Sequence, residues 1–125
     1  MIIGVGTDLI EIGRVKAAIM RRPGLKNRIF SPQELEYCLA KPDPWPSLAA
    51  RFAAKEAVMK AMGVGIGAFA FHAIEVIKEE ASPPAIRLHG KALALARKKG
   101  ISHWHLSLTH HRDDAMAFVI AESRD

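Results

Sequence analysis

A single glutamate lies within the longest apolar helical pattern of the chain. The stretch 47–67 is rich in alanine, with Ser47 as the expected N-cap and Gly63 as the left-handed residue expected to end the helix. At about 100° per residue, Glu56 falls on the same stripe as Phe52, whose side chain we expect to be buried. An ionised carboxylate among apolar neighbours is costly unless a cation or hydrogen-bond donors meet it. Glu56 is therefore the first candidate for chemistry.

Two interpretations of Glu56 are open from these residues. Lys60 follows one turn later, and a Glu-x-x-x-Lys pair on a helix is most simply a salt bridge. The glycines Gly63, Gly65 and Gly67 come next, and a glycine-rich exit lets backbone N–H groups approach a phosphate closely. Their spacing does not match the P-loop pattern. The glycines therefore favour a phosphate site without defining one.

A second acid lies near the start of the chain, where residues 1–10 alternate as a strand does. Gly4, Gly6 and Asp8 share one strand face, so that face has no side-chain bulk next to the acid. Another group could approach there. The alternative is that Asp8 caps the helix that follows the strand.

Cations dominate the next part of the chain. No acidic residue occurs between Ile12 and Gln33, and the helix expected over 12–22 turns Arg14, Arg21 and Arg22 outward. The basic residues of this segment are Arg14, Lys16, Arg21, Arg22, Lys26 and Arg28. A solvated helix face is one interpretation, but clustering of one sign favours a docking surface for an acidic partner. The net charge of +5 points the same way.

The remaining patterns predict short helices and antiparallel strands. A capping box at Ser31–Glu34 opens a helix that runs to Leu39, and a proline-rich connector follows over 41–46. Further along the chain we expect strands over 71–78 and 85–88, a helix over 91–99, and strands over 103–109 and 115–122. Half of the 125 residues are apolar. These elements predict an α+β fold in which residues 1–125 form a single compact domain, with the long central helix packed on antiparallel strands.

Several classes of protein are disfavoured by what the sequence lacks. It has no apolar run of about 18 residues, and its start does not read as a signal peptide, so we expect a soluble, cytoplasmic protein without a membrane partner. Cys38 is the single cysteine, which excludes an internal disulfide and favours core packing. A nucleic-acid-binding module is the main rival function. We do not expect a nucleic-acid partner, because no aromatic residue interrupts the basic segment to stack on bases.

Four histidines lie between residues 103 and 111. His103 and His105 share a strand face, and a zinc ion bound by them with Asp8 or Glu56 is a minor alternative. Histidines on strand surfaces more often form hydrogen bonds. One functional histidine at the strand end is the more modest interpretation.

Four blocks of sequence resemble one known family in order and spacing. They are residues 4–12 (GVGTDLIEI), 30–38 (FSxxExxYC), 51–61 (RFAAKEAVMKA) and 106–110 (LSLTH). In these blocks the chain is similar to the holo-(acyl carrier protein) synthases, the small bacterial class of 4′-phosphopantetheinyl transferases. Two departures are visible: Thr109 stands where the family commonly has serine, and His111 where it often has a small or polar residue.

The resemblance implies the 4′-phosphopantetheinyl transferase fold, an activity and a set of residue roles. The activity is magnesium-dependent transfer of the phosphopantetheine arm of coenzyme A to a serine of an acyl carrier protein, in support of fatty acid biosynthesis. Asp8 and Glu56 would hold Mg²⁺, while Lys60 would meet the pyrophosphate and His110 the phosphates of coenzyme A. Lys60, Glu56 and His110 are thus the catalytic candidates. The nucleotide pocket would comprise Lys60, Gly63, Gly65, Pro84, Thr109 and His110.

The resemblance also implies partners. The basic face of Arg14, Arg21, Arg22 and Arg28 would dock the acidic carrier protein. The chain would form a homotrimer with active sites shared between protomers.

Overall fold

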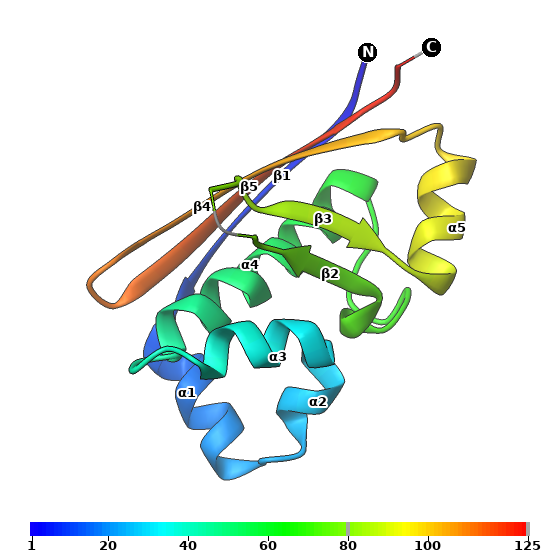
Figure 1. Cartoon of the computed structure of the whole chain (residues 1–125). Helices are drawn as coiled ribbons and strands as arrows, with labels where there is room; N and C mark the ends of the chain where they lie inside the picture. The colour runs from blue at the N-terminus through cyan, green and yellow to red at the C-terminus, as the bar shows by residue number, and fades with distance from the viewer. Residues whose placement is uncertain (80, 125) are drawn as a thin grey trace.

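The computed structural model describes residues 1–79 and 81–124, and a three-stranded antiparallel sheet spans its length (Figure 1). The strand order is β1 (Ile2–Glu11), β5 (Asp114–Glu122), β4 (His103–His111). One face of this sheet is covered by the long helix α4 (Trp45–Met62). A two-stranded hairpin, β2 (Ile74–Ile77) and β3 (Ala85–Leu88), lies on the other side of α4 from β1. The α+β architecture predicted from the sequence is thereby confirmed.

The shorter helices lie at the two ends of α4 (Figure 1). They are α1 (Ile12–Arg21), α2 (Leu25–Ile29) and α3 (Pro32–Leu39) at one end and α5 (Gly90–Lys98) at the other. The two chain ends lie side by side, and the amino group of Met1 donates to the carbonyl of Ser123 at 2.7 Å. No helix in the described part of the chain is long and apolar enough to cross a membrane.

The bare face of β1 is the contact surface for α4. A Cβ added to Gly6 would lie 1.8 Å from the carbonyl oxygen of Ala57, and one added to Gly4 equally close to that of Ala61. Only glycine allows the helix backbone to approach a strand this closely. The buried alanines of α4 complete the contact. Asp8 is the next residue on this face of β1. The close approach of the two backbones therefore places α4 next to the Asp8 side chain.

Both ends of α4 can be compared with the prediction. Gly63 adopts a left-handed φ of 73° and ends the helix, as expected. The predicted start was wrong, because α4 begins at Trp45 and Ser47 is already inside it. Pro46 is tolerated in the first turn, where its missing N–H needs no partner, and Asp43 Oδ1 accepts from the N–H of Trp45 at 3.2 Å. The proline-rich connector therefore ends at Pro44.

The other predicted elements are present with small shifts. The capping box of α3 forms both of its reciprocal bonds, between Ser31 and Glu34. The first strand of the hairpin is shorter than expected, because Phe71–Ala73 form a 3₁₀ turn. Helix α1 has no side-chain cap, so Asp8 is not a capping residue. Helix α2 was not predicted.

The outward face of the sheet is apolar and exposed. Thr7 pairs with Phe118 and Leu9 with Met116, and these side chains point away from α4. Val5 is 51% exposed, Leu9 66% and Phe118 39%. Three large apolar side chains on adjacent strands form a surface of the kind that contacts another protein.

Candidate functional site

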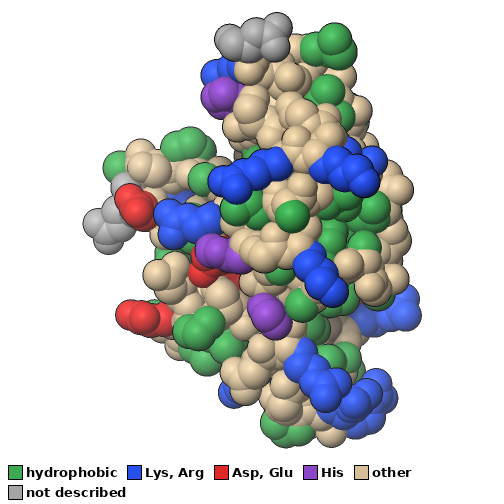
Figure 2. Space-filling model, turned by 90° about the vertical axis from the view of Figure 1, so that its right-hand side faces the viewer, with side chains coloured by type: hydrophobic (Ala, Val, Ile, Leu, Met, Phe, Trp, Pro, Cys, Tyr) green, Lys and Arg blue, Asp and Glu red, His purple; other side chains and the backbone are tan. Residues whose placement is uncertain are grey.

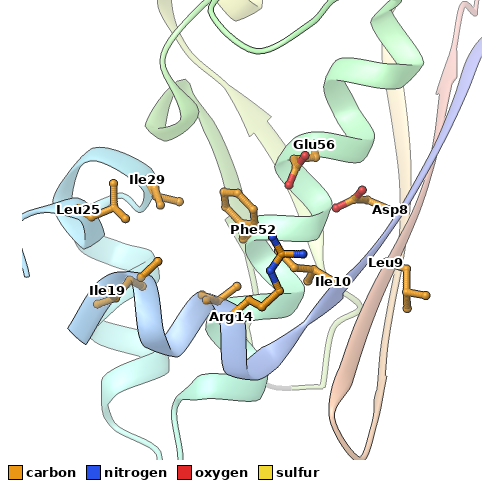
Figure 3. A pocket seen from close by; sticks show the side chains of 11 residues that line it. Asp8, Leu9, Ile10, Arg14, Ile19, Leu25, Ile29, Phe52 and Glu56 are labelled. Carbon is orange, nitrogen blue, oxygen red and sulfur yellow. The ribbon is translucent and has the colours of Figure 1, made fainter. Parts of the chain in front are cut away.

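Strand β1 and helix α4 bring Asp8 and Glu56 together. Figure 3 shows their carboxylates pointing toward one another at one end of a cleft of about 410 Å³. Partial burial and the neighbouring Asp8 charge raise the pKa of Glu56, and Lys60 opposes this shift. A neighbouring negative charge and partial burial both disfavour the ionised form of the Glu56 carboxyl. The pair predicted from two separate sequence patterns is one site in the fold.

Lys60 joins this site through the strand. Its Nζ donates to Asp8 Oδ1 at 3.2 Å and to the carbonyl oxygen of Thr7 at 2.9 Å. The salt bridge that the helical spacing suggested, from Lys60 to Glu56, is therefore not the one observed among the described residues. The Lys60 side chain is 56% exposed, whereas Asp8 is 13% exposed. The ammonium is thus held beside Asp8 and is open to solvent, where an anionic ligand could reach it.

The rest of the cleft is an apolar trough. Helices α1 and α2 and Phe52 of α4 form its walls, which are lined by Val15, Ala18, Ile19, Leu25, Ile29 and Phe52. Arg14 lies among these residues and also lines the cleft (Figure 3). Sequence reasoning placed Arg14 on an outward docking face together with Arg21, Arg22 and Arg28. All four are exposed, but Arg14 is the one that reaches the cleft with the two acids.

A second, smaller cleft of about 220 Å³ contains Pro84, Thr109 and His110. These residues were predicted as part of a nucleotide pocket, and the fold brings them together. Among the described residues that line the two clefts, neither Gly63 nor Gly65 occurs. They lie in the exit loop of α4. The structure therefore joins three of the six predicted nucleotide residues in this cleft, and Lys60, Gly63 and Gly65 do not line it.

Sequence reasoning missed the basic side chains of the second cleft. Lys41, Arg51 and Lys78 line it beside His110. Arg51 is only 4% exposed and stacks over the Tyr37 ring at 4.5 Å. Among the described residues its Nε has no hydrogen-bond partner. A buried, incompletely satisfied guanidinium in a cleft is suited to bind an anion. The signal was available, because Arg51 opens the RFAAKEAVMKA block.

The two clefts are separate in one chain. Among the described residues, they share no lining side chain. Asp8, Glu56 and Lys60 meet where α4 crosses β1, while Thr109 and His110 stand at the end of β4. The two acids and the residues Thr109 and His110 therefore line different clefts of the same chain.

The alternative sites are not supported. His105 contacts Glu122 at 3.0 Å and His103 contacts Ser102 at 3.0 Å. No group of three His, Cys, Asp or Glu side chains that could hold zinc occurs within residues 1–79 and 81–124. Cys38 is fully buried and burial raises the pKa of its thiol, which confirms a packing role.

Asp8 and Glu56 are the residues that could hold a hard divalent cation. Carboxylate oxygens are the ligands that Mg²⁺ prefers, and Mg²⁺ commonly binds to one or two of them together with phosphate oxygens and waters. Burial and the Asp8 charge raise the pKa of Glu56 by more than the Lys60 charge lowers it. The donor set and its charge thus fit a divalent ion.

Comparisons with known proteins agree with the fold. The family model described as the 4′-phosphopantetheinyl transferase superfamily matches residues 4–120. A relative from Moorella thermoacetica, a holo-[acyl-carrier-protein] synthase, is 47% identical over 94% of this chain and 92% of its own. The Neisseria meningitidis holo-[acyl-carrier-protein] synthase structure superposes with a TM-score of 0.89, at 34% identity over 98% of this chain and 100% of its own.

A third neighbour contains a ligand. The Helicobacter pylori holo-[acyl-carrier-protein] synthase, solved in complex with coenzyme A, has a TM-score of 0.82 and 30% identity over 94% of this chain and 99% of its own. The family match leaves out only the two ends of the chain. It covers all four sequence blocks and every residue that lines the two clefts. The chain belongs to the 4′-phosphopantetheinyl transferase superfamily.

Proposed function

We propose that the protein transfers the 4′-phosphopantetheine group of coenzyme A to a serine of an apo-acyl carrier protein. The serine hydroxyl gives up its proton to water as its oxygen forms a bond to the phosphorus next to pantetheine, and the bond from that phosphorus to the bridging oxygen breaks. The leaving group is adenosine 3′,5′-bisphosphate, and the product is a holo-acyl carrier protein for fatty acid biosynthesis. The observation that carries the proposal is the convergence of Asp8, Glu56 and Lys60 at one end of a cleft, in a chain of this superfamily.

Asp8 and Glu56 are the proposed magnesium ligands. Bound there, Mg²⁺ would neutralise charge on the pyrophosphate of coenzyme A. The chain itself contributes the two oxygen donors and holds them in place through the tight contact of β1 with α4. Asp8 is fixed further by its bond from Lys60.

Lys60 is the proposed electrophilic side chain. Its side chain is about half exposed, and its ammonium lies beside Asp8, which lines the cleft. A pyrophosphate bound near the carboxylates would therefore lie within reach of a positive charge. Such a charge stabilises the leaving group as its negative charge grows. This role explains why a lysine next to the acids is accessible rather than buried.

The second cleft is the proposed site of the nucleotide half of coenzyme A. Lys41, Arg51, Lys78 and His110 supply cations to its phosphates, and Thr109 and Pro84 line the same space. The unpartnered Nε of Arg51 supports this assignment, because an anion would satisfy it. Gly63 and Gly65, in the exposed loop after α4, are proposed to approach the pyrophosphate through their backbone.

The separation of the two clefts supports a shared active site, of which each cleft would be one half-site. We call the cleft with Asp8 and Glu56 the carboxylate cleft and the cleft with Thr109 and His110 the nucleotide cleft. We propose a homotrimer in which the carboxylate cleft of one protomer faces the nucleotide cleft of the next. The apolar outward face of the sheet, with Val5, Leu9 and Phe118, offers a surface for this association. Thr109 belongs to β4 of the same sheet, so an interface there would lie close to the nucleotide cleft.

The basic face of α1 and α2 is the proposed dock for the carrier protein. Arg21, Arg22 and Arg28 are exposed, and Arg14 connects this face to the cleft. Figure 2 shows a group of Lys and Arg side chains at the end of the molecule formed by α1 and α2. Elsewhere on that view the cations lie apart from one another. A compact basic patch is complementary in charge to an acidic protein.

The direct test is the mass of an apo-acyl carrier protein after incubation with the protein, coenzyme A and Mg²⁺. We expect the mass to increase by one phosphopantetheine group. No increase under conditions in which a holo-[acyl-carrier-protein] synthase relative modifies the same carrier protein would refute the proposal.

A further inference from the structure

A buried network of charged residues links helix α4 to helix α3 through Lys55 and Glu34. Lys55 directly precedes Glu56, and its side chain is fully buried. Its ammonium donates to Glu34 Oε1 at 2.7 Å and to the carbonyl oxygen of Phe71 at 3.3 Å. The third proton is donated to the carbonyl oxygen of Ile74. All three protons of the ammonium are therefore used, although burial lowers the pKa of Lys55.

The carboxylate of Glu34 also accepts hydrogen bonds from two backbone N–H groups. Its Oε1 also accepts from the N–H of Ser31 at 2.9 Å, and its Oε2 accepts from the N–H of Val76 at 3.0 Å. One ion pair therefore joins the start of α3, the middle of α4 and strand β2. We infer that Lys55 is a positioning residue, whose pair with Glu34 sets the rotation of α4 and thereby places Glu56. This inference rests on the proposed function of Glu56.

Apolar packing and directed hydrogen bonds act together on the rotation of α4. Half of its buried residues are alanines, such as Ala53 and Ala54, and its larger buried apolar side chains are Leu48, Val58, Met59 and Met62. Alanines offer little shape to interlock, and apolar burial has no preferred direction. The glycines of β1 set how closely α4 approaches. Three directed hydrogen bonds from Lys55 can fix the remaining freedom, because they require defined angles at fixed acceptors.

The position of Lys55 in the sequence makes this restraint effective. Neighbouring residues of a helix point about 100° apart. Lys55 can therefore point toward α3 and β2 while Glu56 points toward Asp8, and the two side chains share one backbone segment. A displacement of 1 Å in a catalytic group can reduce turnover by about 10²-fold. A rotation of α4 would move Glu56 and Lys60 together.

Stability alone is a poor explanation for the pair. Replacing a buried ion pair with apolar groups of similar volume is often neutral or stabilising, whereas removing one partner is strongly destabilising. The double variant Glu34→Gln/Lys55→Met therefore separates the two roles. We expect its Tm to lie within about 5 °C of the wild type, while kcat falls by at least about 10-fold and KM for coenzyme A stays unchanged.

A matched control comes from the same network. Glu75 accepts from Ser31 Oγ at 2.6 Å and contacts His89 Nε2 at 3.0 Å, and both partners lie outside α4. Glu75→Gln should change Tm and leave kcat within about twofold. The Mn²⁺ affinity of each variant, measured by electron paramagnetic resonance, gives a readout that does not depend on turnover. We expect weaker Mn²⁺ binding only when Lys55 is replaced.

The outcomes decide between the roles. A folded Glu34→Gln/Lys55→Met protein with wild-type kcat and Mn²⁺ affinity overturns the inference. If that variant does not fold, Glu34→Gln/Lys55→Gln, which keeps hydrogen-bonding end groups, is measured instead, and failure of both to fold shows a purely structural pair. If the wild type does not modify any carrier protein, the proposed function fails, and the Mn²⁺ affinities still decide the positioning role.

Discussion

At the scale of single residues, the Asp8–Glu56 pair costs the free protein stability. Burial and the Asp8 charge raise the pKa of Glu56 above its ordinary value of 4.5. The folded state therefore binds this proton more tightly than the unfolded chain. Stability then falls as the pH rises from the unfolded-state pKa to the folded-state one, and the loss persists above that range.

We therefore predict that Glu56→Gln stabilises the protein at pH 7 while abolishing transfer. The gain should disappear below about pH 4, where the wild-type carboxyl is protonated in both states. Urea denaturation at the two pH values, without divalent ions, measures it. Asp8→Ala and Glu56→Ala should also be inactive and folded by circular dichroism. Inactivity caused by unfolding would instead make Glu56 a structural residue.

Lys60→Gln is the second prediction at this scale. The Lys60–Asp8 bond is at the surface, so its loss should change stability by less than about 1 kcal/mol. If Lys60 stabilises the leaving group, kcat should fall by about 10²-fold or more. Gln keeps most of the volume and a donor, which excludes a packing effect. A variant with near wild-type kcat at saturating substrates would remove Lys60 from the chemistry.

The sequence predicted the acids better than their partners. Glu56 was recognisable because a charge in an apolar stripe conflicts with its local pattern, and Asp8 because glycines precede it. The bond from Lys60 to Asp8 was not predictable, because the i,i+4 rule describes one helix and this bond depends on how α4 crosses β1. Arg51 was overlooked for a similar reason: its burial depends on packing against Tyr37 of α3.

At the scale of elements, the contact of β1 with α4 positions the site. Gly6→Ala would place a methyl group 1.8 Å from the carbonyl oxygen of Ala57, so backbone must move. We predict a destabilisation of about 1–3 kcal/mol or more, together with reduced kcat. Gly13→Ala is the matched control, because no atom lies within 4 Å of the added group. That variant should be unchanged or gain up to about 1 kcal/mol. Equal effects of the two changes in urea denaturation would contradict the argument.

The predicted elements with strong periodicity are the ones the structure contains. A local sequence pattern predicts each of three features: helix α1, the capping box of α3 and the alternation of β4. Helix α2 has only five residues, too few for a periodic signal. The early start of α4 was missed because the prolines around Trp45 favour extended backbone locally, whereas in the fold Pro46 occupies the first helical turn.

The basic face of α1 gives a prediction about association. Arg21 is exposed and lies at the end of α1 away from the cleft residues Asp8 and Glu56. Arg21→Glu should slow association with the carrier protein, with a weaker salt dependence, and leave coenzyme A binding unchanged. Stopped-flow measurements at two salt concentrations check this. An unchanged association rate would place the dock elsewhere.

At the scale of the whole molecule, the proposed homotrimer would let the half-site of one protomer complete the half-site of its neighbour. Glu56 lies in the carboxylate cleft and His110 in the nucleotide cleft, and the two clefts are separate within a chain. Glu56→Gln removes one half-site and His110→Ala the other, so each variant alone should be inactive. In a trimer that contains both variants, some interfaces combine the intact carboxylate cleft of one protomer with the intact nucleotide cleft of its neighbour.

We therefore predict that mixing the two inactive variants restores transfer. If equal amounts are unfolded together and refolded, protomers combine at random, and about a quarter of the interfaces should carry two intact half-sites. Activity should approach that fraction of the wild type refolded in the same way. The two proteins mixed without refolding are the control, and their activity should rise only as fast as subunits exchange. No recovery in the refolded mixture, with trimers verified by light scattering, would mean that each chain completes its own site and that the sheet face serves association alone.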